Sequence, residues 1–416
     1  MKNRVVITGL GCVSPLGNNS PITWQNIIDG QSGAGLITHY DTSDYDCKIA
    51  AEVKDFDGAA LFGPRDARRM DRCTQFALSA AQEAVEDANL KIEDANRDRI
   101  GAVVGTGIGG IETMYDQFFN FTERGPSRVS PFLVPMMLPD TPGSNLAIKL
   151  GLRGTNFAVV TACATGTNAI GEASEIIRRG QTDVMLAGGC EAAIVPLAMA
   201  GLSKMGAMST YEGDPTRASR PFNLDRTGFL MGEGAAIVVL ESLEYAQSRG
   251  AQILAELVGY GSTNDAFHIS APAENGSGAA ACMQMALEYA NLEPVDIDYI
   301  NAHGTGTPLN DISETKAIKT VFGEQAYQVP ISSTKSMTGH LLGAAGAIEA
   351  LFAVKVIQDG IMPPTINYEV PDPDCDLDYI PNQAREKQVV HVMSNSFGFG
   401  GHNAVIILKK FIEADL

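Results

Sequence analysis

The chain has 416 residues, of which 45% are hydrophobic and 19% are charged, a composition that excludes an intrinsically disordered protein. Its length exceeds the roughly 250–300 residues at which single hydrophobic cores stop growing, and therefore predicts two domains or two fused halves. The net charge of −19 argues against nucleic acid or an anionic membrane as the main partner, because phosphate groups require a positive field on the protein.

The segment VVITGLG at 5–11 is the first predicted strand. Glycines and Pro15 interrupt the apolar stretch there, so we do not interpret it as a signal peptide. No later apolar stretch reaches the ~18 uncharged residues that a membrane helix needs, and no membrane association is expected. The seven cysteines include no C-x-x-C pair, which indicates neither a disulfide framework nor a metal site and favours a cytoplasmic setting.

Short β-branched runs that end in glycine or small residues recur along the chain and predict buried strands. After 5–11, these runs cover 100–107, 157–166, 183–189, 235–242, 253–261, 297–308, 329–340 and 389–401. Amphipathic helices separate several of them, as at 70–89, where apolar residues recur every three or four positions. Gly180, Gly250 and Gly360 each follow a predicted helix at a left-handed C-terminal position. The alternation of strand and helix predicts an α/β fold.

One parallel between the two halves suggests a duplication. Cys163 precedes a helix rich in small residues and then the strand DVMLAGG, and His340 precedes a similar helix and later the strand HVMSNSFG. In a duplicated fold, pseudo-twofold packing would bring Cys163 and His340 to one central site. We divide the chain into an N-terminal half at 1–250 and a C-terminal half at 251–416.

Cys163 is the predicted nucleophile. It lies in VVTACATGTNAIG, where an apolar strand leads through a turn into a helix of small residues. The partial positive charge of a helix N-terminus favours a thiolate, so we expect a lowered thiol pKa. For the other six cysteines we expect inert burial, the common state of free cysteines.

Two histidines lie in glycine-rich turns after apolar strands, His303 in NAHGTGTP and His340 in STKSMTGHLLGAAG. Such turns allow a substrate to approach closely, which favours a functional role for both side chains. Lys335 lies on the same turn as His340, and Glu349 lies in the helix of small residues that follows. A carboxylate there would be buried and would require a partner, so we expect Lys335, Glu349 and a histidine to interact.

Other motifs that could carry chemistry are weak or missing. GTGIGG at 105–110 lacks both the spacing of a dinucleotide-binding loop and an acidic residue on a following strand. No Walker sequence, H-E-x-x-H or G-x-S-x-G occurs in the chain. The sequence therefore argues against nucleotide-binding, zinc-protease and serine-hydrolase functions.

Four long motifs, in order, resemble the signatures of the β-ketoacyl-acyl-carrier-protein synthases of type II. They are TACATG around Cys163, NAHGTGTPLND around His303, SSTKSMTGHLLGAAGAIE around His340, and NSFGFGGHN at 395–403. The resemblance extends over essentially the whole chain. It implies the thiolase fold, in which two similar halves make a five-layered α-β-α-β-α sandwich, usually in a homodimer.

The resemblance also implies a role for each residue in a decarboxylating condensation in fatty acid elongation. Cys163 would carry the acyl chain as a thioester, and His303 and His340 would bind the malonyl thioester oxygen. Backbone N–H groups of Cys163 and Phe399 would form an oxyanion hole, with Gly400 easing exposure of the backbone, and Phe399 would gate the site. Lys335 and Glu349 would complete the catalytic group.

Substrate binding is likewise implied by the resemblance. Thr305 and Thr307 would bind the phosphopantetheine arm of an acyl carrier protein, and Ile108 would close the acyl pocket. No further cofactor would be required. Because that carrier protein is acidic in the family, we expect it to dock on a basic patch, and the densest one is Arg65, Arg68 and Arg69 with Arg72, which Lys204 could extend.

Alternatives remain at the level of the sequence. A degradative thiolase of the same fold is disfavoured because thiolases need a second cysteine as base. A non-catalytic partner subunit, like a polyketide chain-length factor, would lack the nucleophile that Cys163 provides. A polyketide ketosynthase uses the same chemistry and is not separated from a fatty acid enzyme. The segment 134–151, with Pro139, Asp140 and Pro142, departs from the smoother apolar run of the family.

Overall fold

The computed structural model describes residues 3–412, and its central feature is a ten-stranded sheet that consists of two five-stranded halves. In the first half the strand order is β5 (Asn156–Phe157), β4 (Ile100–Gly105), β6 (Val184–Glu191), β7 (Gly234–Ser242) and β1 (Val5–Val13). In the second half it is β10 (Ile331–Ser332), β9 (Tyr299–Asn301), β13 (His391–Gly398), β14 (His402–Lys409) and β8 (Ala255–Asn264).

The two halves have the same pairing pattern. In the first, β4 is parallel to β5 and β6, whereas β7 is antiparallel to β6 and β1. In the second, β9 is parallel to β10 and β13, whereas β14 is antiparallel to β13 and β8. The halves join where β1 meets β8 through two antiparallel residue pairs. The predicted duplication is therefore visible in the topology.

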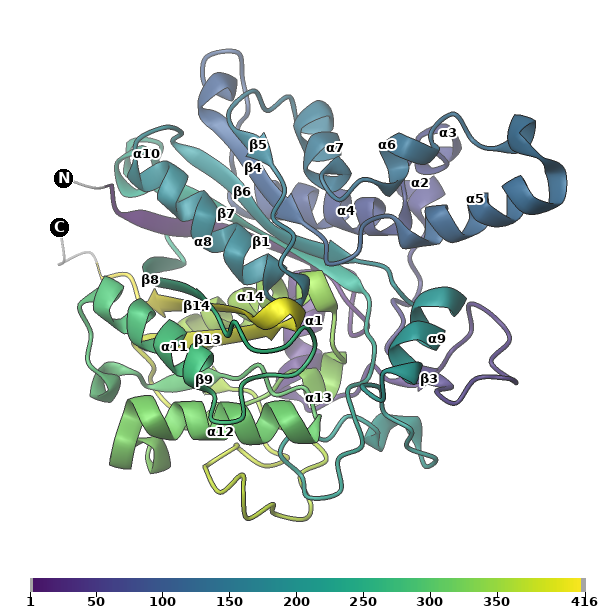
Figure 1. Cartoon of the computed structure of the whole chain (residues 1–416). Coiled ribbons are helices and arrows are strands. Elements are labelled where there is room, and N and C mark those ends of the chain that lie inside the picture. The colour runs from purple at the N-terminus through teal and green to yellow at the C-terminus, as the bar shows by residue number, and fades with distance from the viewer. Residues whose placement is uncertain (1–2, 413–416) are drawn as a thin grey trace.

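Helices complete five layers (Figure 1). α8 (Thr165–Arg178) and α14 (Ala345–Asp359) lie between the two sheet halves and contact strands of both. α4 (Arg72–Asp87) and α7 (Thr141–Leu150) cover the outer face of the first half, and α11 (Ser277–Ala290) and α12 (Pro308–Phe322) cover that of the second. The central helices are buried on nearly all sides because glycine and alanine let them pack closely. The predicted thiolase fold is confirmed.

Shorter elements connect and flank these layers. They are α1 (Ser20–Ile28), β2 (Gly35–Leu36), β3 (Ile49–Ala50), α2 (Gly58–Phe62), α3 (Pro64–Ala67), α5 (Ile111–Arg124), α6 (Leu133–Met137), α9 (Pro196–Lys204), α10 (Leu243–Ser248), α13 (Lys335–Thr338), β11 (Ile361–Met362) and β12 (Arg385–Glu386). α5 and α6 project from the body of the molecule (Figure 1). Between residues 3 and 412, no helix has the length and apolar character needed to cross a membrane.

Several local predictions are confirmed. The helix predicted at 70–89 is α4, and its apolar face is buried against β1 and β7. Gly180, Gly250 and Gly360 follow helices with φ of +72°, +68° and +67°, in the left-handed region that favours glycine. In the segment 134–151, Asp140 precedes α7, and Pro142 lies in its first turn, where a missing N–H costs nothing.

The buried strand predicted at 157–166 is wrong. Only Asn156–Phe157 pairs with the sheet, and both residues are exposed. β5 is the edge of the first half, and after it the chain turns into the central layer rather than continuing along the sheet. The β-branched residues that suggested burial include Val160, which is 50% exposed.

Candidate active site

Cys163 lies in a tight turn that feeds α8. The 3-10 turn at Ala162–Ala164 precedes the helix, and Ala162 has φ of +49°, which is rare and strained for a residue with a side chain. The C-terminal half contains the same construction, since Leu342 has φ of +44° in the 3-10 turn that precedes α14. In this alignment Gly343 corresponds to Cys163, and His340 lies three residues earlier.

One pocket collects most of the predicted residues. Cys163, His303, His340, Phe399, Thr305 and Thr307 all line it. The imidazole rings of His303 and His340 stand nearly perpendicular, with centroids 5.3 Å apart. Phe397 packs on His303 at 5.8 Å and Phe229 on His340 at 5.4 Å. These two phenylalanines were not predicted, although Phe397 lies in the motif NSFGFGGHN at 395–403.

The expected lowering of the Cys163 pKa is not found. Burial raises the pKa of this thiol to about 11, although the Lys335 charge and the N–H groups of Phe399 and Cys163 act in the opposite direction. The residue is only 6% exposed, and this burial is the largest influence on the pKa of the thiol. Cys163 therefore rests as a thiol, with two backbone N–H groups directed at its sulfur.

His303 and His340 are neutral. Burial lowers the pKa of both well below the ordinary value, and the Lys335 ammonium lowers it further. Within residues 3–412, both ring nitrogens of His340 lack a hydrogen-bond partner, and so does Nδ1 of His303. Two neutral imidazoles on the wall of the pocket can each donate one N–H to a substrate oxygen.

Lys335 and Glu349 lie behind the pocket and form an ion pair in which both residues are 1% exposed. Burial raises the pKa of Glu349 to about 7, and the Lys335 charge opposes that rise. A buried pair of this kind is costly to break, because the remaining charge would be unpaired. The lysine thus has a fixed place from which its charge reaches Cys163 and both histidines.

The loop that carries His303 and the two threonines is braced from α12. Glu314 accepts the backbone N–H groups of His303 and Gly304 at 2.8 and 2.7 Å. Asp311 accepts the N–H of Gly306 at 3.2 Å, and the hydroxyl groups of Thr305 and Thr307 lie 2.9 Å apart. Neither carboxylate was predicted, although Asp311 and Glu314 lie three residues apart on one face of α12.

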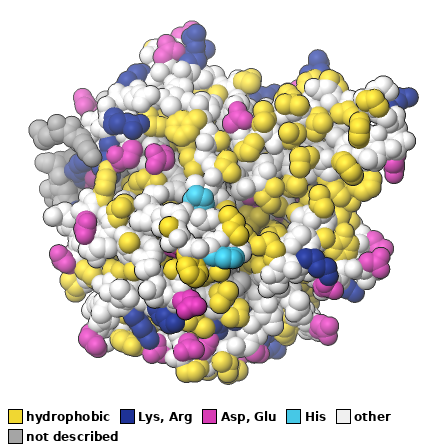
Figure 2. Space-filling view, viewed as in Figure 1, with side chains coloured by type: hydrophobic (Ala, Val, Ile, Leu, Met, Phe, Trp, Pro, Cys, Tyr) yellow, Lys and Arg dark blue, Asp and Glu magenta, His cyan; other side chains and the backbone are white. Residues whose placement is uncertain are grey.

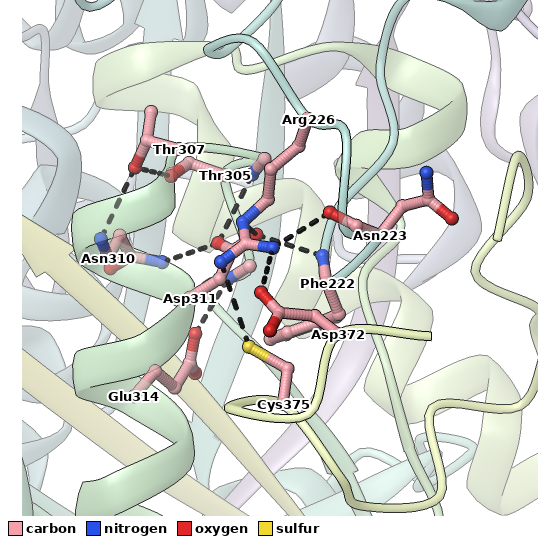
Figure 3. Close-up of polar contacts among 12 residues, drawn as sticks. Phe222, Asn223, Arg226, Thr305, Thr307, Asn310, Asp311, Glu314, Asp372 and Cys375 are labelled. Carbon is pink, nitrogen blue, oxygen red and sulfur yellow. Dashed lines mark hydrogen bonds and ion pairs between the residues drawn. The ribbon is translucent and has the colours of Figure 1, made fainter. Parts of the chain in front are cut away.

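Figure 3 shows how Asp311 is held in turn. The Arg226 guanidinium lies between Asp311, at 3.1 Å, and Asp372, at 2.6 Å. Asp311 also accepts the backbone N–H of Phe222 at 2.9 Å. All of these groups are buried, so the ion pairs fix three loops against one another.

The Phe399 loop packs directly on the nucleophile turn. A Cβ at Gly398 would lie 2.9 Å from the Thr161 oxygen and 3.0 Å from the Cys163 nitrogen, so only glycine fits there. Gly400 has φ of +82° and donates its N–H to Ile269 at 2.7 Å. This loop therefore touches both Cys163 and the segment that covers the pocket.

Ile108 does not line this pocket. It lies on the turn that follows β4, next to the nucleophile turn, and is 40% exposed. A Cβ on the preceding Gly107 would lie 3.6 Å from the Ala162 oxygen. Gly400 also lies outside the pocket lining, behind Phe399 and Gly401.

The arginines of the predicted docking patch do not lie on one helix. Arg65 lies on α3, and Arg68 and Arg69 lie in the turn before α4, because Asp71 caps α4 and ends any continuous helix. Arg72 points inward to Glu233 at 2.8 Å, and Arg69 stacks on the Phe132 ring at 4.6 Å.

Two basic side chains of the predicted patch are fully available. Arg65 and Arg68 are exposed and have no ion-pair partner in the part of the chain that the structure describes. Lys204 is also exposed and lies 3.2 Å from Asp46.

No set of three or more His, Cys, Asp or Glu side chains in residues 3–412 is arranged to hold a metal ion. Buried side-chain oxygens without a hydrogen-bond partner in the same range include Oδ1 of Asn301, Oε2 of Glu349, Oγ of Ser394 and Oδ1 of Asn395.

Comparison with known proteins decides the family. The family model described as "Beta-ketoacyl synthase, N-terminal domain" matches residues 2–246, and the model described as "Beta-ketoacyl synthase, C-terminal domain" matches residues 254–369. The chain belongs to the β-ketoacyl synthase family. This synthase is 53% identical over 408 residues to the Staphylococcus aureus (strain N315) protein named 3-oxoacyl-[acyl-carrier-protein] synthase 2, with 98% of each chain covered.

Other relatives extend the similarity. A Synechocystis protein with the same name is 50% identical over 410 residues, with 99% of each chain covered. A solved ketosynthase in complex with a type II polyketide acyl-carrier protein matches with a TM-score of 0.92 and 38% identity, covering 99% of this synthase and 100% of that chain. A β-ketoacyl synthase structure from Burkholderia phymatum matches with a TM-score of 0.91, 37% identity and the same coverage.

Proposed function

We propose that this β-ketoacyl synthase elongates fatty acyl chains by two carbons through a decarboxylating Claisen condensation. The observation that carries the proposal is the joint presence of a buried cysteine and two neutral histidines in one pocket. The cysteine supplies a nucleophile that can store an acyl group, and the histidines supply donors for a developing enolate. The proteins at 50–53% identity carry the name 3-oxoacyl-[acyl-carrier-protein] synthase 2, which supports this reaction.

In the first step Cys163 accepts the acyl group from the phosphopantetheine thiol of an acyl carrier protein. The cysteine sulfur forms a bond to the acyl carbon, the pantetheine carbon–sulfur bond breaks, and the thiol proton passes to the departing pantetheine sulfur. The N–H groups of Cys163 and Phe399 lie beside the sulfur. In the proposed step they stabilise the tetrahedral oxyanion that forms on the attacked carbonyl. The high thiol pKa means that proton loss accompanies attack rather than preceding it.

In the second step a malonyl thioester occupies the same pocket. Its carbon–carboxylate bond breaks, carbon dioxide leaves, and the electron pair moves to the thioester as an enolate whose oxygen accepts N–H donors from His303 and His340. The enolate carbon then attacks the acyl carbon on Cys163, and the cysteine leaves and regains a proton. Neutral histidines can fill this role because each uncharged imidazole keeps one N–H donor.

We propose an acyl carrier protein as the donor of both substrates. A similar ketosynthase is described in complex with an acyl-carrier protein. Thr305 and Thr307, on the lip of the pocket, are placed to hydrogen-bond a pantetheine arm. No other cofactor takes part in this chemistry. All seven cysteines are free and buried, which suits a cytoplasmic enzyme.

We also propose a homodimer. β5 is an exposed edge strand, and such edges are normally paired or covered. Hydrophobic side chains gather over the side of the molecule that carries α5 and α6 (Figure 2). The exposed hydrophobic residues on α5, on α6 and directly after α6 are Met114, Phe118, Phe119, Phe121, Val134 and Leu138. A second copy would cover both features, and sedimentation velocity measures the state directly.

Cys163→Ala tests the proposed function. The variant should fold normally yet form no acyl-enzyme and no β-ketoacyl product from acyl and malonyl carrier proteins, because no other thiol lines the pocket. Intact-protein mass spectrometry detects the acyl adduct, and product mass detects condensation. Carbon dioxide release from malonyl carrier protein should persist, since it depends on the histidines. Condensation at the wild-type rate would refute the mechanism.

A further inference from the structure

Glu191 is a buried carboxylate that the proposed reaction does not use. It ends β6 and is fully buried. Burial raises its pKa to about 7, even though several donors surround the carboxylate. Burial of a carboxylate costs free energy unless hydrogen bonds compensate for the lost water.

The contacts of Glu191 join two turns. One oxygen accepts the Thr106 hydroxyl at 2.8 Å, and the other accepts the N–H of Gly107 at 2.7 Å. The second oxygen also accepts the N–H of Gly343 at 3.0 Å. Thr106 in turn accepts the backbone N–H of Ile108 at 3.3 Å. A single carboxylate thus holds the turn that carries Ile108 against the turn that follows His340.

Glycines enclose this carboxylate so closely that the turns cannot shift independently. A Cβ at Gly343 would lie 2.4 Å from the Gly107 nitrogen, and a Cβ at Gly107 would lie 2.7 Å from a Glu191 oxygen. A Cβ at Gly189, two residues before Glu191, would lie 2.1 Å from the Gly343 oxygen. Backbone atoms of the two turns are in direct contact, so a displacement of one turn also displaces the other.

The internal duplication gives the contact a further meaning. Gly343 corresponds to Cys163, because each follows a residue with positive φ in the turn that enters a central helix. At Cys163 the N–H serves the reacting group, whereas at Gly343 the equivalent N–H serves the Glu191 carboxylate. Glu191 also acts on Cys163 through its charge, which raises the pKa of the thiol.

From these contacts we infer that Glu191 is a positioning residue that sets the acyl-chain turn at Ile108 and the His340 turn relative to the nucleophile. The inference rests on the proposed condensing function and on the place at the end of the acyl pocket that the family resemblance implies for Ile108. Loss of the carboxylate frees both turns, so acyl-chain selection and decarboxylation change together. Loss of the Thr106 hydroxyl frees only the Ile108 turn, so chain selection changes while decarboxylation does not.

Two conservative variants test this. Glu191→Gln keeps the shape but presents a donor where one carboxylate oxygen accepted. Thr106→Val removes the hydroxyl that donates to Glu191 and accepts the N–H groups of Ile108 and Gly109. We measure kcat and KM for condensation with carrier proteins bearing saturated chains of four to eighteen carbons, and carbon dioxide release from malonyl carrier protein. Glu191→Gln should lower kcat and carbon dioxide release about tenfold and alter the ratio of long-chain to short-chain kcat/KM. Thr106→Val should alter only that ratio, and Glu191→Ala should lose about 10² in kcat.

Glu241→Gln is the matched control. Glu241 is also a fully buried strand carboxylate, and it accepts bonds from Thr8 and Arg249 away from the pocket. It should lose stability without any change in chain-length ratio. If Glu191→Gln and Thr106→Val keep the wild-type ratio and wild-type carbon dioxide release, the positioning role is refuted, whatever their stability. If Glu191→Ala fails to fold, the results for Glu191→Gln and Thr106→Val decide whether Glu191 has a positioning role. Absence of condensation by the wild-type protein would instead refute the proposed function.

Discussion

Burial sets the protonation state of every catalytic side chain in the pocket. Removal from water keeps Cys163 a thiol and both histidines uncharged, and the Lys335 charge acts on all three. The helix terminus that the sequence pointed to is present, yet burial raises the pKa of Cys163 instead of lowering it. Position at the start of a helix therefore did not predict the direction of the pKa shift.

Each histidine should be separable from the nucleophile. His303→Ala and His340→Ala should still trap an acyl group on Cys163, while carbon dioxide release from malonyl carrier protein falls about 10²–10³-fold, the usual cost of one oxyanion donor. Because the pKa of both lies well below the ordinary histidine value, neither imidazole gains a charge between pH 7.5 and 6. Any pH dependence of wild-type release in this range belongs to Glu191 and Glu349, whose pKa burial raises to about 7. Radiolabelled carbon dioxide measures release, and the wild-type rate in either variant would contradict the assigned roles.

At the scale of single elements, the motifs were predictable because they are local. Cys163, His303, His340 and Phe399 lie in glycine-rich turns after strands, and the pocket brings all four together. The buried carboxylates that brace those turns were not predicted. The spacing of Asp311 and Glu314 on one helix was visible in the sequence, but the backbone N–H groups that Glu314 and Glu191 bind carry no sequence signal.

Conformation was harder to predict than position. Ala162 and Leu342 have positive φ, but neither is a glycine that would have indicated this conformation in the sequence. The equivalence of Cys163 with Gly343 was therefore not apparent. β-Branched residues at 157–166 predicted a buried strand, yet the edge of a sheet depends on which strands lie beside it. Both errors concern tertiary context, which overrides local preference.

The close packing of the Phe399 loop on the nucleophile turn can be tested with one methyl group. In Gly398→Ala the added Cβ would lie 3.0 Å from the Cys163 nitrogen, so the turn and the loop must separate. Displacement of that order should reduce the rate of Cys163 acylation about 10²-fold. Single-turnover acylation, followed by mass spectrometry, gives the rate.

Gly201→Ala provides the comparison. Its methyl group meets nothing within 4 Å on the exposed face of α9. Acylation should remain at the wild-type rate, and the free energy of unfolding should rise by about 0.5–1 kcal/mol because alanine restricts the unfolded chain. Equal acylation rates in the two variants would show that the loop contact does not position the nucleophile.

On the scale of the whole molecule, net charge works against the proposed partner. A synthase of net charge −19 and an acidic carrier protein repel each other at long range. Docking then depends on a local basic patch. In the structure, only some of the arginines of the predicted patch point outward. Arg72 is paired with Glu233 and Arg69 packs on Phe132, which leaves Arg65 and Arg68 directed to solvent.

Reversal of these two charges, in Arg65→Glu with Arg68→Glu, should raise KM for acyl carrier protein about tenfold at low ionic strength and flatten its dependence on salt, because exposed charges act mainly on encounter. Arg179→Glu, at the exposed end of α8, changes charge in the same direction away from the patch and should leave KM nearly unaltered. Turnover of a small pantetheine thioester should be the same in all three proteins, since it needs no docking surface. Steady-state kinetics across a salt series decides the outcome. If the double variant retained the wild-type KM at low salt, the carrier protein would have to dock on another surface, and the overall repulsion would have to be overcome there.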